Sequence, residues 1–138
     1  EQRGGTANVT VILSDERISS PILNTYDTVI VLNQQSLDRF EKQVKPGGVL
    51  IYDSYGIHQP PTRTDIKSYC INAMEASFEM KNGKAFNMIV LGAYLKIKPV
   101  VSIENVLKGL KKTLPERHWN LLPMNEEALK KGMSLVSE

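Results

Sequence analysis

The fold is decided by two apolar runs, Thr28-Val29-Ile30-Val31-Leu32 and Val49-Leu50-Ile51-Tyr52, and by the segment that joins them. Both runs are continuous and rich in branched side chains, which is typical of strands buried on both faces of a parallel sheet. Residues 34–44 repeat apolar side chains at helical period, and Lys45-Pro46-Gly47-Gly48 predicts a turn that ends this helix. Strand, helix and strand with short joins predict a right-handed βαβ unit.

The rest of the chain predicts one earlier strand and a helical tail. Residues 8–13 alternate in polarity, as a strand with one more apolar face does. Residues 86–95 are apolar nearly all round, which predicts a buried helix in which Gly92 permits close packing. The other expected elements are a strand at 66–71, a helix at 72–80, a helix capped by Ser102 and ended by Pro115, and a last helix capped by Asn125. We therefore expect one α/β domain over residues 1–138, layered α/β/α, with a mostly parallel sheet and a helical C-terminal third.

Composition and charge narrow the classes of function. The chain has 138 residues and a formal net charge of +2, which is too weak to favour nucleic-acid binding. No apolar run reaches the roughly 18 residues that span a bilayer. The single cysteine, Cys70, predicts a reducing, cytoplasmic location. It cannot hold an iron–sulfur cluster, which takes about four thiolates, and neither histidine has a second ligand at metal-binding spacing. No catalytic or metal-binding residue is therefore predicted in this chain.

Five residues are candidates for cofactor or substrate binding. Arg3 can hold an anion in a fork of donors, and Gly4 and Gly5 let the backbone approach a ligand closely. Asp53 ends a buried strand, at the edge where open α/β sheets bind their ligands, although it also suits a helix or turn cap in the Ser54-Tyr55-Gly56 turn. Asn87 is a polar residue in an apolar helix, and a buried amide would need a partner in a loop or in a site.

Three other polar positions and the cysteine have competing interpretations. Asn33 and Gln34 follow the strand at 28–32 and would neighbour Asp53 if the two strands are adjacent, but helix capping explains them equally simply. His58 lies in the long loop at 55–64, where exposure is more usual than catalysis. Cys70 is interpreted as a small packed hydrophobe.

Three stretches together resemble the gamma subunit of the 2-oxoacid:ferredoxin oxidoreductases. They are residues 1–8 with 12–21, residues 26–27 with 45–54, and Asn87-Met88-Ile89-Val90-Leu91-Gly92-Ala93. The resemblance covers nearly the whole chain, and the Arg-Gly-Gly, Ser-Asp-Glu and Asn-Met pieces occur in the family's order. The family's glycine-rich strand–turn–helix is missing, so the resemblance implies a chain trimmed at its N-terminus. An apolar edge would then be exposed, where we expect a second copy or another partner to bind.

The resemblance implies one subunit of a multi-chain enzyme that oxidatively decarboxylates a 2-oxo acid to an acyl-CoA and passes electrons to ferredoxin. Thiamine diphosphate and iron–sulfur clusters would be held by alpha and beta subunits, with a delta subunit where there is one, and coenzyme A would be a co-substrate. We favour 2-oxoglutarate over branched-chain 2-oxo acids, pyruvate and indolepyruvate. Arg3, Gly4 and Gly5 would meet an anionic group, and Asp53 and Asn87 would order the loops around it.

Two other classes stay open at this point. Residues 26–31 and the strand around Leu50 look similar to the later strands of S-adenosylmethionine-dependent methyltransferases. The helical tail and the missing acidic Gly-x-Gly loop depart from that pattern. The second alternative is a non-enzymatic α/β interaction module, because a subunit without its own cofactor site has the same sequence features.

Overall fold

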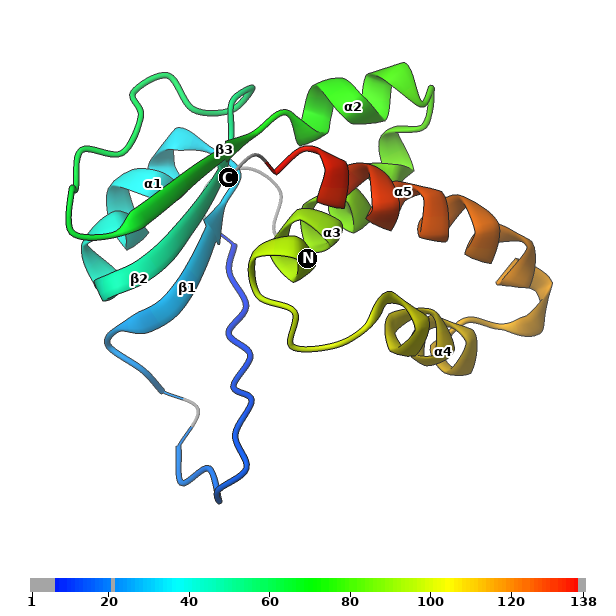
Figure 1. Cartoon of the computed structure of the whole chain (residues 1–138), viewed down its shortest axis with the longest axis horizontal. Coiled ribbons are helices and arrows are strands. Elements are labelled where there is room, and N and C mark those ends of the chain that lie inside the picture. Colours follow the sequence, from blue (N-terminus) through cyan, green and yellow to red (C-terminus); the bar gives the residue numbers. More distant parts are fainter. Residues whose placement is uncertain (1–6, 21, 137–138) are drawn as a thin grey trace. The chain divides into compact units, whose positions relative to one another are not determined.

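The computed structural model describes residues 7–20 and 22–136. The chain divides into two compact units: unit 1 is Glu1–Tyr52 with Gly56–Tyr69, and unit 2 is Asp53–Tyr55 with Cys70–Glu138. Figure 1 shows the helices and strands of both units in chain order. The single domain and the α/β/α layering expected from the sequence stay predictions.

A three-stranded sheet, in the order β1-β2-β3, has most of its residues in unit 1 (Figure 1). Its strands are β1 (Tyr26–Val31), β2 (Val44–Asp53) and β3 (Lys67–Ile71). β1 pairs with β2 in parallel. The Gly47 N–H donates to the Asp65 carbonyl and the Ser54 N–H to the Ile71 carbonyl. Residue numbers ascend together in these two bonds, so β3 runs parallel to β2 as well. The α/β class and the parallel sheet are thus confirmed.

The predicted βαβ unit is present, with a shorter helix than expected. Helix α1 (Gln34–Phe40) passes into a 3₁₀ turn at Glu41–Gln43, and Val44 already begins β2. The small core of this unit joins four side chains, those of Val31, Leu37, Val44 and Leu50. One apolar residue each from β1 and α1 and two from β2 therefore account for the packing of helix on sheet.

The predicted turn at residues 45–48 is instead a bulge inside β2. The pairing with β1 jumps from Tyr26 opposite Val44 to Thr28 opposite Val49, so three extra residues of β2 are looped out between them. Gly47 takes a φ of 79° there, a conformation that favours glycine.

Two strand predictions are wrong. Residues 8–13 form no strand in the described part of the chain, and the apolar face of this segment, Val9, Val11 and Leu13, is 66–86% exposed. Alternation selects which side chains share a face but supplies no neighbouring strand to pair with. β1 is not buried on both faces either, because it is an edge strand of the described sheet and Ile30 stays 39% exposed.

Unit 2 is helical after the end of β3. Its helices are α2 (Ala73–Glu79), α3 (Phe86–Ile97), α4 (Ile103–Thr113) and α5 (Leu122–Ser134), with 3₁₀ turns at Gly83–Ala85 and Glu116–Leu121. The buried helix predicted around residues 86–95 and the helical C-terminal third are confirmed. Among the described residues, no helix has the length and apolar character that crossing a membrane requires.

Helices α3 and α5 approach each other closely at two glycines. A Cβ added to Gly92 would lie 2.0 Å from the Leu129 carbonyl oxygen, and one added to Gly132 would lie 1.9 Å from the Ile89 carbonyl oxygen. Each helix therefore has a glycine where the other helix's backbone passes. The close packing predicted for Gly92 is confirmed.

Of the two predicted helix caps in the tail, one is correct. The Ser102 hydroxyl accepts from the Asn105 N–H at 3.1 Å and caps α4. Asn125 is not a cap: α5 already begins at Leu122, with Pro123 in the first turn, where its missing N–H costs nothing. The burial predicted for Cys70 is also wrong, because its side chain is exposed on β3.

Candidate functional site

The carboxyl end of β1 holds one group of candidate residues in unit 1. The Asn33 side chain accepts from the Ser36 N–H at 2.8 Å, so Asn33 caps α1. The Gln34 Oε1 accepts from the N–H groups of His58 and Gln59, both at 2.8 Å. Gln34 thus anchors the backbone of the loop that follows β2 at His58 and Gln59, whereas Asn33 acts as a helix cap.

The same loop is held at its other end by Arg63. The Arg63 guanidinium donates to the Glu41 carbonyl at 2.9 Å and to the Val44 carbonyl at 2.6 Å, and it forms an ion pair with Asp65 at 2.6 Å. Hydrogen bonding from Arg63 lowers the pKa of the Asp65 carboxyl. Both ends of the loop are tied, so the exposed His58 side chain is presented on an ordered backbone. Binding residues often lie on loops that a rigid scaffold positions in this way.

Asp53, in unit 2, is buried and turned toward the chain's own backbone. It is 1% exposed, and its Oδ1 accepts from the N–H groups of Ala73 at 3.0 Å and Met74 at 3.4 Å. Asn72, at the start of α2, makes no capping bond with its side chain, so Asp53 caps this helix from a distance of 20 residues. Burial raises the pKa of Asp53, partly opposed by the bonds from Met74 and Ala73. Asp53 is thus a cap, but of α2 and not of the turn at residues 54–56.

Beside this cap lie residues that the sequence analysis missed. The Ser54 hydroxyl donates to the Asn72 side chain at 2.5 Å. The rings of Tyr55 and Phe78 stand edge to face, with centroids 6.2 Å apart and planes at 83°. They are 68% and 58% exposed. A tyrosine after a strand and a phenylalanine in a short helix give no pattern that predicts their meeting, which depends on the turn after β2.

The remaining candidates are not brought into this group. Asn87 lies in the first turn of α3 and is exposed, with its side chain accepting from the Met88 N–H at 3.1 Å. The premise that Asn87 is a buried amide is therefore wrong. Arg3, Gly4 and Gly5 lie outside the described residues.

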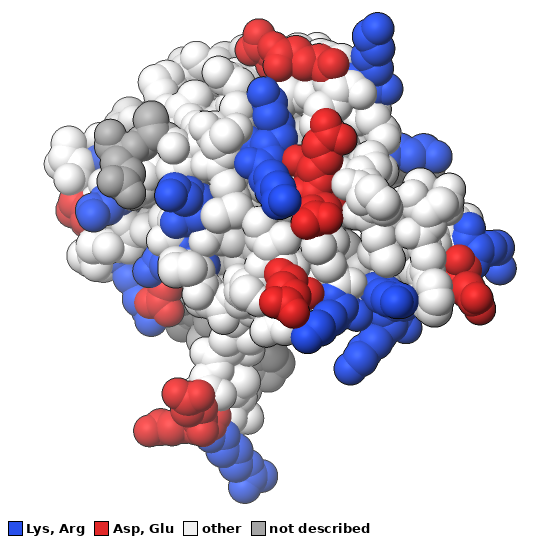
Figure 2. Space-filling model, turned by 45° about the vertical axis from the view of Figure 1, so that its right-hand side comes forward, with Lys and Arg blue, Asp and Glu red and all other residues white. Residues whose placement is uncertain are grey.

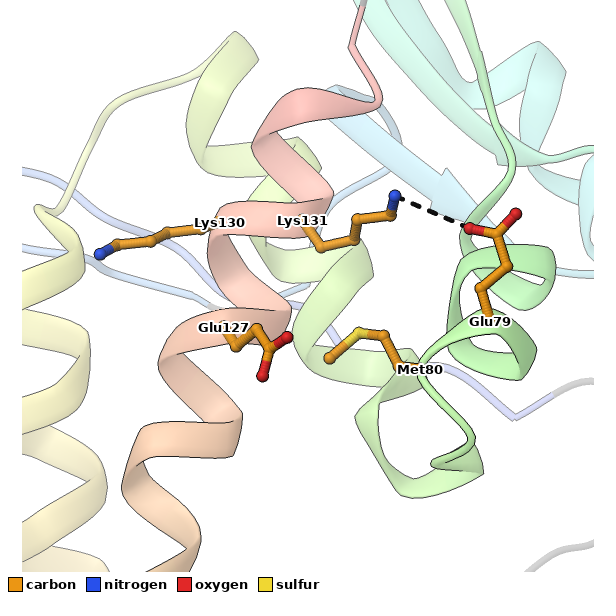
Figure 3. Close-up of a pocket in the computed structure, with 5 residues that line it drawn as sticks. All are labelled: Glu79, Met80, Glu127, Lys130 and Lys131. Atoms are coloured by element: carbon orange, nitrogen blue, oxygen red, sulfur yellow. Dashed lines mark ion pairs between the residues drawn. The ribbon is translucent and has the colours of Figure 1, made fainter.

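Residues of α2, its C-terminal end and α5 line a groove with a volume of about 480 Å³ (Figure 3). Lys131 of α5 pairs with Glu79 of α2 at 3.7 Å, while Lys130 points away from Met80 (Figure 3). The lining residues are Glu79, Met80, Glu127, Lys130 and Lys131. Two acidic and two basic side chains cancel, so this groove favours neither a strong anion nor a cation.

Charge elsewhere is similarly mixed. Lys and Arg side chains alternate with Asp and Glu over the face shown in Figure 2. Within residues 7–20 and 22–136, no three His, Cys, Asp or Glu side chains gather in a way that could hold a metal ion.

A parallel sheet with helices, and with polar loop residues collected where β1 and β2 end, defines a protein of the open α/β class. The chain belongs to the pyruvate ferredoxin/flavodoxin oxidoreductase family, whose sequence profile matches residues 1–135. This membership argues against the methyltransferase alternative, which the helical tail had already weakened.

One curated relative is the ketoisovalerate oxidoreductase subunit VorA of Methanothermobacter thermautotrophicus. It is 30% identical over 139 residues, and the alignment covers 100% of this chain and 28% of the relative. The chain thus spans well under half the length of this relative.

Two solved structures have similar folds. The gamma subunit of a keto/oxoacid ferredoxin oxidoreductase from Geobacter sulfurreducens matches with a TM-score of 0.66 and 27% identity, over 78% of this chain and 62% of that one. The 2-oxoglutarate:ferredoxin oxidoreductase from Magnetococcus marinus, with 2-oxoglutarate, coenzyme A and succinyl-CoA bound, matches with a TM-score of 0.70 and 26% identity, over 80% of this chain and 20% of that one.

Proposed function

We propose that this chain acts as the gamma subunit of a 2-oxoacid:ferredoxin oxidoreductase. The enzyme would carry out the coenzyme A-dependent oxidative decarboxylation of a 2-oxo acid to an acyl-CoA and pass the electrons to ferredoxin. The observation that supports this most is the family match over residues 1–135, together with the likeness to a gamma subunit. 2-Oxoglutarate is the substrate we favour, since it is bound in one of the similar structures.

The electron-transfer groups of the proposed enzyme would belong to other chains. Cys70 is the only cysteine of the sequence, so this chain does not fit an iron–sulfur cluster with its usual thiolate ligands. We assign thiamine diphosphate and the clusters to alpha and beta subunits, with a delta subunit where there is one. This chain would contribute to assembly and to the approach of coenzyme A.

For the coenzyme A contact we propose the five residues named from the sequence. Arg3 would hold an anionic group of coenzyme A, and the backbone at Gly4 and Gly5 would approach it closely. Asp53 would act indirectly, because its bonds to Ala73 and Met74 fix the start of α2. The exposed amide of Asn87 would be free to donate to a ligand or to a neighbouring subunit.

The proposal is tested by tagging the native gene product in its source cell, isolating what copurifies, and assaying the isolate. We expect thiamine- and cluster-bearing chains, and coenzyme A-dependent reduction of ferredoxin that is fastest with 2-oxoglutarate among 2-oxoglutarate, pyruvate, ketoisovalerate and indolepyruvate. Faster turnover of another 2-oxo acid would change the substrate. Partners without any such activity would favour the interaction module instead.

The exposed face of residues 8–13 leads to a second proposal, that this chain by itself forms a homodimer. Val9, Val11 and Leu13 share one face and are 86%, 75% and 66% exposed, a strip that a second copy would cover. Light scattering on the purified chain should then give the mass of two copies at micromolar concentration. Changing Val11 to Lys should return it to one copy, and a monomer before that change would refute the dimer.

A further inference from the structure

We propose that Tyr55 and Phe78 form a docking corner for a planar heteroaromatic ring, and that its ligand is the adenine of coenzyme A. This inference rests on the proposed function for the identity of the ligand. The corner itself is seen in the geometry of unit 2: two aromatic rings stand at 83° to each other, and more than half of each side chain is exposed. Single exposed apolar side chains are ordinary on protein surfaces, so the inference rests on the pairing of the two rings and on the polar groups beside them.

Both rings are positioned by ordered backbone. The Ser54 N–H donates to the Ile71 carbonyl at 3.0 Å, so the pairing of β2 with β3 continues to the residue before Tyr55. Phe78 lies on the exposed side of α2, whose opposite side buries Ala73, Ala76 and Ser77. A ligand ring would therefore meet a preformed corner, which lowers the entropy cost of binding.

The shape of the corner suits a flat ring. In an edge-to-face pair one aromatic face stays open, and the second ring forms a wall beside it. A purine can stack on the open face and touch the wall with its edge, and such stacking tolerates any π-face. The nearby Asp53 carboxylate is buried against α2, where it accepts from the N–H groups of Ala73 and Met74 instead of facing a ligand.

Polar groups next to the corner match the edge of a purine. The Ser54 hydroxyl and the Asn72 amide are exposed and bonded to each other at 2.5 Å. When the Asn72 Oδ1 accepts from Ser54, its NH₂ group keeps two donors for a ring nitrogen. This combination of an apolar face with a few fixed polar groups is typical of cofactor and nucleotide sites. It also lies where β2 ends, the edge at which open α/β sheets bind ligands.

The size of the patch favours a ring over a protein surface. At these exposed fractions the two side chains present about 200–300 Å², whereas one side of a standard protein interface takes about 800 Å². The small area and the adjoining hydrogen-bonding pair indicate a ligand, and a protein contact becomes an outcome that the experiment can detect.

The experiment compares coenzyme A with its two halves, on the complex purified from the source cell. Phe78→Leu and Tyr55→Leu remove a ring from an exposed position, and Tyr55→Phe keeps it as the matched control. We expect each leucine variant to raise the KM for coenzyme A about tenfold, in the range that base–aromatic stacking produces. The KM for the 2-oxo acid, and that for pantetheine, which lacks adenine, should not change.

A binding measurement separates this inference from the proposed function. Labelled adenosine 3′,5′-bisphosphate should bind to the same purified protein in equilibrium dialysis, and its Kd should rise about tenfold in Phe78→Leu and stay constant in Tyr55→Phe. Such binding without oxidoreductase activity would retain the corner and reject the proposed function. An unchanged KM for coenzyme A and an unchanged Kd would overturn the corner, and so would leucine variants whose sole defect is loss of copurifying chains.

Discussion

Gly132→Ala is expected to lower the free energy of unfolding by about 3 kcal/mol, at the upper end of what overpacking usually costs. The added Cβ would lie 1.9 Å from the Ile89 carbonyl oxygen, which belongs to the backbone of α3 and has no rotamer to escape to. Gly92→Ala should behave alike, since its Cβ would meet the Leu129 carbonyl oxygen at 2.0 Å. Urea unfolding of the three proteins, followed by circular dichroism, measures both differences.

Gly109→Ala is the matched control. Gly109 lies in α4, where an added Cβ meets nothing within 4 Å, so the same change should stabilise the protein by about 0.5–1 kcal/mol through helix propensity. The double variant of Gly92 and Gly132 should lose less than the sum of the single losses, because one displacement of α5 from α3 relieves both contacts. Equal stability of Gly132→Ala and Gly109→Ala would contradict the close crossing.

The two glycines differ in how well the sequence predicts them. Gly92 interrupts a helix that is apolar nearly all round, and that contrast alone predicts a close neighbour. Gly132 lies in a helix with charged residues around it, where the sequence does not indicate that a glycine packs closely against a neighbour. Its role follows only from the crossing of α3 and α5, which is a tertiary contact between distant segments.

The βαβ unit was predictable because its residues carry the information locally. Apolar runs mark β1 and β2, and the helical repeat between them marks α1. The bulge at residues 45–48 was not predictable, because Pro46 and Gly47 suit a turn and a bulge equally well. The register of β2 against β1 decides between the two. Pro123 similarly decides where α5 begins, three residues before the Asn125 cap that the local pattern suggests.

The candidate site likewise contains contacts that a local pattern can predict and contacts that depend on the tertiary fold. The rule about strand ends predicts that Asn33 and Gln34 neighbour Asp53, and this stays a prediction. The bonds from the backbone N–H groups of His58 and Gln59 to Gln34 have no sequence signal. The meeting of Tyr55 and Phe78 depends on the path of the chain after β2 and on the rotation of α2, and neither has a sequence signal.

Asp53→Ala is expected to lower the free energy of unfolding by about 2 kcal/mol, since it removes a cap and leaves the N–H groups of Ala73 and Met74 without their acceptor. Asp53→Asn keeps an oxygen at the same place and should lose less. Thermal unfolding at neutral pH compares the two. Equal losses in both variants would mean that the charge of the carboxylate, and not its oxygen, holds the start of α2.

The pH dependence tests the electrostatics of the same residue. Burial raises the pKa of Asp53 above its ordinary value of 3.8, so between that value and the raised one the folded protein binds the proton more tightly than the unfolded chain does. The resulting contribution to stability is complete below pH 3.8 and is lost as the pH rises through the raised pKa. The stability of the wild type relative to Asp53→Asn should therefore increase on acidification from neutral pH toward 4.

Asp65 supplies a contrast of opposite sign. Hydrogen bonding from Arg63 lowers the pKa of Asp65, so its contribution is present above pH 3.8 and is lost as the pH falls through the lowered value. The stability of the wild type relative to Asp65→Asn should thus decrease on acidification, and only slightly, because the Asp65 side chain is 51% exposed and solvent screens the pair. Two aspartates in one chain should give slopes of opposite sign in the same titration. If both differences fell together on acidification, the bonds from Ala73 and Met74 would outweigh the burial of Asp53, and its carboxylate would be the form that the fold prefers.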